Sequence, residues 1–155
     1  MFFSGRGRPS VGRQSREAVL HRLISVLGQL SVKHSVAPLS TMLIDRSTNN
    51  LTKAYAANAL GRIGEPAAID ALAASLSAKD DMVRRQVAMA LGRIDRDAVV
   101  PHLMKLRRDK SIAVAEVATE AMRRWEERLG QRLGTKLEVP AVKARKKKIM
   151  PAAER

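Results

Sequence analysis

The pentapeptide Ala-Leu-Gly-Arg-Ile occurs twice in this chain, beginning at Ala59 and again at Ala90. Its leucine anchors a longer pattern, whose spacings are 33, 31 and 31 residues across the series Leu27, Leu60, Leu91 and Met122. A period of roughly 20 to 50 residues is typical of stacked-repeat proteins, because one unit cannot bury its apolar face alone. This period constrains the possible folds more than any other feature of the sequence.

Apolar residues recur at fixed distances from each anchor. Those four and eight positions before it are mostly apolar, which indicates one face of a helix. In the first three units, apolar residues also follow nine and twelve positions after the anchor and indicate a second helix. We therefore expect no sheet, and two sets of helices: long ones near 15–30, 51–63, 82–94 and 113–130, alternating with shorter ones near 36–45, 67–77 and 98–108.

Glycine, proline and N-cap residues mark the ends of these helices. Gly64 and Asp95 follow two of the long helices, and Pro66 and Pro101 suit the first turns of the shorter ones. Candidate N-caps for the later long helices are Asp80, Asp81 and Ser111.

Glycine follows the anchor in three units, at Gly28, Gly61 and Gly92. Glycine inside a helix costs about 1 kcal/mol relative to alanine. Its recurrence at one place predicts that stacked helices approach each other closely there.

The 155 residues are 45% hydrophobic but only 3% aromatic, which favours a core of packed helices. The absence of cysteine excludes a disulfide scaffold, a thiolate zinc site and a cysteine nucleophile. No apolar run approaches the about 18 residues of a membrane span, and no secretory signal is recognisable. We expect a soluble, cytoplasmic protein with a repeat domain at 15–130 between basic flexible tails at 1–14 and 131–155.

The net charge of +14 is concentrated at the two ends: residues 1–22 carry +4 and residues 126–155 carry +5. Basic tails indicate a polyanionic partner such as nucleic acid, the ribosome or an anionic membrane, although they also serve solubility alone. Residues 5–9, Gly-Arg-Gly-Arg-Pro, resemble the core of an AT-hook, which lies in the minor groove of A·T-rich DNA.

Candidate nucleic-acid contacts fall into three groups. They are the N-terminal Arg6, Arg8 and Arg13; the internal Arg84, Arg85, Lys105, Arg107 and Arg108; and the C-terminal Lys143, Arg145, Lys146, Lys147 and Lys148. Compact basic runs of this kind suit phosphate contacts that do not read sequence. Arginines also recur two residues after the anchor, at Arg62, Arg93 and Arg124.

Catalytic patterns are absent from the sequence. The three histidines stand in different units, without a carboxylate or second histidine at metal-ligand spacing. No serine has the glycine pattern of a nucleophile elbow, and no glycine-rich loop follows a predicted strand. We expect no enzyme activity, no metal and no cofactor.

Residues 51–109 resemble short HEAT-like repeats of the phycobilisome-lyase type. The resemblance implies an all-α fold, a short right-handed α-solenoid of about three helical hairpins with a C-terminal capping helix. Asp81, Val83 and Arg84 match the Asp-x-Val-Arg motif, which implies an inter-repeat hydrogen-bond ladder. The equivalent arginine is missing in the other units, where Leu20, Lys53 and Ala115 stand, so we expect an incomplete ladder.

In such repeats the second helices usually line a concave groove. Here that places a protein-binding groove at Ser40, Thr41, Ala73, Ala74 and Met104. The favoured function is a non-enzymatic, nucleic-acid-associated binding protein, associated with the nucleoid if the partner is DNA. The alternatives are a scaffold or adaptor without nucleic acid and, third, a bilin-lyase-like or DNA-repair protein of the same fold. The partner and the oligomeric state stay open.

Overall fold

The computed structural model describes residues 11–134, and at Val11 and Arg13 the backbone alone. Its long helices are α1 (Val11–Gln29), α3 (Asn50–Ile63), α5 (Asp81–Arg93) and α7 (Ile112–Leu133). Its shorter helices are α2 (Val36–Ile44), α4 (Ile69–Ala74) and α6 (Val100–Leu106). Short 3-10 turns accompany them: η1 (Lys33–Ser35), η2 (Pro66–Ala68), η3 (Ser75–Ser77) and η4 (Asp97–Val99). No strand occurs among the described residues.

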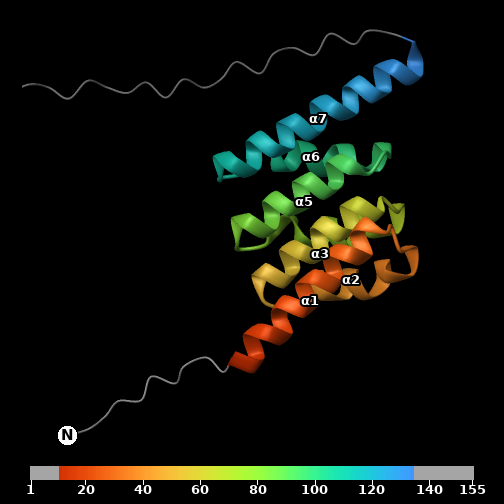
Figure 1. Cartoon of the computed structure of the whole chain (residues 1–155). Helices are drawn as coiled ribbons and strands as arrows, with labels where there is room; N and C mark the ends of the chain where they lie inside the picture. Colours follow the sequence, from red (N-terminus) through yellow and green to blue (C-terminus); the bar gives the residue numbers. More distant parts are fainter. Residues whose placement is uncertain (1–10, 135–155) are drawn as a thin grey trace, which may run out of the picture.

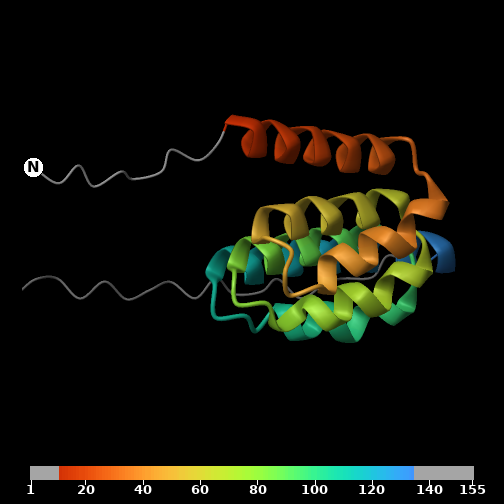
Figure 2. The ribbon, with the colours of Figure 1, turned by 90° about the horizontal axis from the view of Figure 1, so that it is seen from below.

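The long helices lie side by side in chain order and form one layer (Figure 1). The shorter helices form a second layer against it, as Figure 2 shows from below. Successive long helices pack on one another, and α2 and α6 each pack on the long helix that follows them. The predicted all-α solenoid, three helical hairpins closed by a final helix, is confirmed.

Helix boundaries agree with the sequence pattern to within a few residues. α1 begins at Val11 and α7 runs to Leu133, so both helices enter segments that were assigned to the tails. Gly64 ends α3 in the left-handed conformation, at φ 72°. The Asp80 carboxylate caps α5 by accepting from the backbone N–H groups of Met82 and Val83. Ser111 precedes α7 without a capping bond and donates instead to Asp81.

Each glycine that follows an anchor packs against an alanine of the next repeat. A Cβ built on Gly61 would lie 2.4 Å from the Cα of Ala90, and one on Gly28 would lie 2.8 Å from the Cα of Ala59. On Gly92 it would lie 2.6 Å from the Cβ of Ala121. These distances are too short for a side chain, so the close approach predicted from the glycines is confirmed. Ala-Leu-Gly repeats because its alanine faces the preceding repeat and its glycine faces the following one.

Candidate binding site

Arg84 is buried, with a side chain only 4% exposed. Its Nε and Nη2 donate to the two carboxylate oxygens of Asp109 at 2.8 and 2.9 Å, and its Nη1 donates to the carbonyls of Ala78 and Lys79. This guanidinium lowers the pKa of Asp109, whose charged form it stabilises. Arg84 is therefore a structural residue. Its prediction as a nucleic-acid contact is corrected, because burial and these four hydrogen bonds leave its guanidinium unavailable to a partner.

The end of α6 carries cations that have no acidic partner. Lys105 and Arg108 are exposed and Arg107 is half-buried, and within residues 11–134 none of the three takes part in an ion pair or a side-chain hydrogen bond. Arg85 is exposed but lies on α5, where it lines a different groove between α5 and α7. The structure thus brings Lys105 and Arg108 together and leaves Arg85 apart from them.

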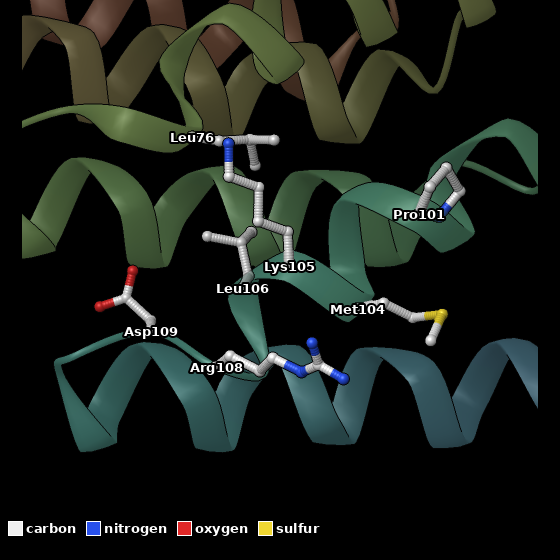
Figure 3. Close-up of a pocket in the computed structure, with 7 residues that line it drawn as sticks. All are labelled: Leu76, Pro101, Met104, Lys105, Leu106, Arg108 and Asp109. Carbon is white, nitrogen blue, oxygen red and sulfur yellow. The ribbon is translucent and has the colours of Figure 1, made fainter.

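Lys105 and Arg108 border a groove beside α6, with a volume of about 520 Å³. Figure 3 shows Arg108 extending in the direction of Met104 and Lys105 extending towards Leu76. Apolar groups come from Leu76, Pro101, Met104 and Leu106, of which Met104 is half exposed. Asp109 completes the lining, but Arg84 already holds its carboxylate. The groove therefore combines an apolar surface with unneutralised positive charge.

Of the five groove residues predicted from sequence, Met104 lines this groove. Thr41 and Ala74 are exposed and Ser40 and Ala73 are half-buried, on α2 and α4 of the same layer. The Thr41 hydroxyl donates to the Ala37 carbonyl, while the Ser40 hydroxyl is buried without a hydrogen-bond partner. Positive charge in the shorter-helix layer is thus concentrated at α6, since the predicted positions on α2 and α4 are small and neutral.

Sequence reasoning missed Leu76 and Pro101 as lining residues of the groove. Pro101 was expected only to start a helix, and it does stand in the first turn of α6. Leu76 comes from η3 of the preceding repeat, so its place depends on how the repeats stack. The Asp-x-Val-Arg motif indicated a hydrogen bond for Arg84, but not that its partner is Asp109, 25 residues away.

The groove between α5 and α7 has mixed charge. Arg85, Arg93 and Arg124 line it together with Glu116 and Glu120. Burial lowers the pKa of Arg93, and the neighbouring Arg62 and Arg124 lower it further. Arg93 therefore lies close enough to Arg62 and Arg124 for their charges to repel, but Arg124 is paired with Glu120.

The histidines do not form a site. His21 is buried, its Nε2 lies 2.8 Å from the Thr52 hydroxyl, and its ring stacks on Tyr55 at 4.5 Å between centroids. Among residues 11–134 no cluster of three or more His, Asp or Glu is placed to hold a metal ion. In the same range, no helix combines the length and the apolar character of a membrane span.

Several predicted contacts lie outside the described residues. These are Arg6, Arg8, Lys143, Arg145, Lys146, Lys147 and Lys148, together with the side chain of Arg13.

A search of curated proteins gave no match to this chain. The family model for HEAT repeats matches it twice, over residues 13–81 and 36–123. The two overlapping matches extend from α1 into α7, across all three hairpins whose stacking the glycine contacts establish. The chain belongs to the HEAT-repeat family.

Proposed function

We propose that this protein is a non-enzymatic scaffold that binds an acidic segment of a partner protein in the groove beside α6. HEAT repeats suggest a protein-interaction scaffold in general. One observation carries the more specific proposal: Lys105 and Arg108 border an apolar groove and have no acidic partner in the described part of the chain.

The two kinds of surface would contribute differently to binding. An apolar side chain of the partner covering Met104 and Pro101 removes apolar area from water, at about 25 cal/mol per Å². Carboxylates facing Lys105 and Arg108 add association rate and choice of partner more than affinity, because rim charges stay hydrated. The expected ligand is therefore a short segment with one or two apolar residues flanked by Asp or Glu.

Peptide display on the full-length chain tests this directly. We expect enriched peptides to be acidic with an apolar residue. They should bind at least tenfold more weakly to the double variant Lys105→Glu/Arg108→Glu, because the reversed charges repel the peptide carboxylates. The matched control is Lys79→Glu/Arg96→Glu, which reverses two other exposed charges and should retain binding. Enriched peptides that bind both double variants equally well would refute the proposal.

A nucleic-acid partner is the second candidate, favoured by the distribution of charge. The described residues 11–134 hold 20 basic and 13 acidic side chains, and the remainder of the net charge of +14 lies beyond them. Phosphate contacts make affinity fall steeply with salt, with a slope in log K of about −0.9 per phosphate neutralised on duplex DNA.

Fluorescence anisotropy with a labelled DNA duplex and a single-stranded RNA, across a salt series, tests the second candidate. Charge-driven binding predicts a steep salt dependence and loss of binding on deleting residues 1–10 and 135–155. Absence of binding at low salt by the full chain excludes nucleic acid and leaves the protein-binding proposal standing.

A further inference from the structure

Within the described residues 11–134, nothing packs on one apolar side of α1. Val19, Leu23 and Val26, together with Leu30 directly after the helix, are 60%, 57%, 39% and 70% exposed. Their spacing of four, three and four residues places them along a single stripe. α1 is also the outermost member of the long-helix layer (Figure 2), so this stripe lies at one end of the solenoid.

The equivalent positions of the next two repeats are all buried. They are Thr52, Ala56, Ala59 and Ile63 around α3, and Val83, Val87, Ala90 and Ile94 around α5, none more than 8% exposed. This face is directed at the preceding repeat, since Ala59 and Ala90 contact Gly28 and Gly61. α1 therefore exposes the face that α3 and α5 both bury.

Two occupants are disfavoured by the residues themselves. A further glycine-containing repeat helix needs a small residue opposite its glycine, but Val26 stands where the later repeats have alanine. The far end of a second copy also fits poorly, because Arg123 of α7 occupies the glycine position and is paired there with Glu120 and Glu127. Head-to-tail stacking would bury these charges against Val26.

A second α1 helix fits the stripe better. The four-three-four spacing is that of the apolar seam in a two-helix coiled coil, where side chains interdigitate at a greater distance than glycine contacts allow. In an antiparallel pair that crosses midway between Leu23 and Val26, Leu23 of each copy lies opposite Val26 of the other copy. Val19 then meets Leu30 of the second copy.

The charges on α1 favour the antiparallel arrangement. In it, Arg22 lies across from Gln29 of the second copy, and Arg16 projects past the end of that copy's helix. A parallel pair would instead place the two Arg16 side chains together in the extended seam. A twofold axis lets one surface serve both copies. We propose that this protein forms a symmetric dimer through the exposed faces of two antiparallel α1 helices, independently of the proposed partner groove.

Sedimentation of the full-length chain over a concentration series tests the dimer. The variant Leu23→Glu/Leu30→Glu should weaken dimerisation at least tenfold while its circular dichroism stays unchanged, because both side chains are exposed in the monomer. Ile112→Glu is the matched control: Ile112 is also 70% exposed but lies at the start of α7, and this variant should dimerise as the wild type does.

Disulfide trapping tests the orientation, since the chain contains no cysteine of its own. In an oxidised equimolar mixture of Leu23→Cys and Val26→Cys chains, the antiparallel pair predicts mixed dimers in excess of either homodimer. Predominant Val26→Cys homodimers would overturn the antiparallel arrangement. A chain that stays monomeric at every concentration would overturn the dimer itself, and dimers appearing only after deletion of 1–10 or 135–155 would assign the stripe to those segments.

Discussion

At the C-terminal end of the solenoid, Arg123 of α7 stands at the position where Gly28, Gly61 and Gly92 each receive the next helix, and it pairs with acidic residues of its own helix. At the N-terminal end, α1 carries exposed valine and leucine where the next two long helices are buried. Exposed charges that pair with each other on one helix are already stable in water, whereas covering an apolar stripe lowers the free energy. Among the described residues, the charges of α7 are therefore satisfied on their own helix, whereas the apolar stripe of α1 is suited to contact with an apolar partner.

The two ends also differ in how they are attached. The turn before α7 is held by the buried Arg84–Asp109 pair, and Arg128 of α7 donates to the Gly92 carbonyl of α5 at 3.1 Å. α1 is attached to α3 through the glycine contact at Gly28 and the hydrogen bond between His21 and Thr52.

The largest effect is expected at the C-terminal attachment. Asp109→Asn leaves the buried Arg84 charge uncompensated and should lower the free energy of unfolding by about 3 to 5 kcal/mol at pH 7, measured by urea denaturation. Asp97→Asn, which changes a carboxylate that is 78% exposed, should change it by less than about 0.5 kcal/mol. A loss no larger than that of the control would mean that the pair does not hold this end.

The same pair predicts a pH dependence. Arg84 lowers the pKa of Asp109 in the folded state, so the ionised carboxylate favours folding. Its contribution is complete above the unfolded pKa of about 3.9 and is lost as the pH falls through the lower folded value. The difference in free energy of unfolding between wild type and Asp109→Asn should therefore shrink below about pH 4. A difference that stays constant there would contradict the ion pair between Arg84 and Asp109.

The second prediction compares equivalent positions inside and at the end of the stack. Val87→Ala removes fully buried methyl groups from α5 and should cost about 2 kcal/mol. Leu23→Ala, at the same place in α1, should cost less than about 0.5 kcal/mol at concentrations where the chain is monomeric. Equal losses in urea denaturation would show that the α1 stripe is already covered within one chain.

The smallest effect concerns the charged surface of α7. Hydrogen bonding from Arg123 lowers the pKa of Glu120 to about 2, and Arg124 adds to this. Arg123→Ala should raise that pKa towards its ordinary value near 4.5, in an NMR titration of the carboxyl group. The shift should be partial because Arg124 stays bonded to Glu120. An unchanged value would mean that Arg123 is not held at this position.

Much of the fold followed from the sequence, since the spacing of apolar residues and glycines reports directly on helix faces and close contacts. The glycine contacts and the end of α3 at Gly64 were predicted from such local signals. The binding surface was less predictable. The Asp-x-Val-Arg motif indicates a structural hydrogen bond for Arg84 but not its partner, because Asp109 is distant in sequence. Leu76 lines the groove only because of how the repeats stack.

By itself the sequence determined the repeat, the approximate extent of each helix and the places where helices approach closely, because these depend on residues within one unit and on its period. Only the tertiary structure decided which apolar residues are covered. Leu23 and Val87 occupy the same register and share an apolar character, yet one is 57% exposed and the other is fully buried. Burial depends on whether a neighbouring helix is present, and periodicity carries no information about that at the end of a stack.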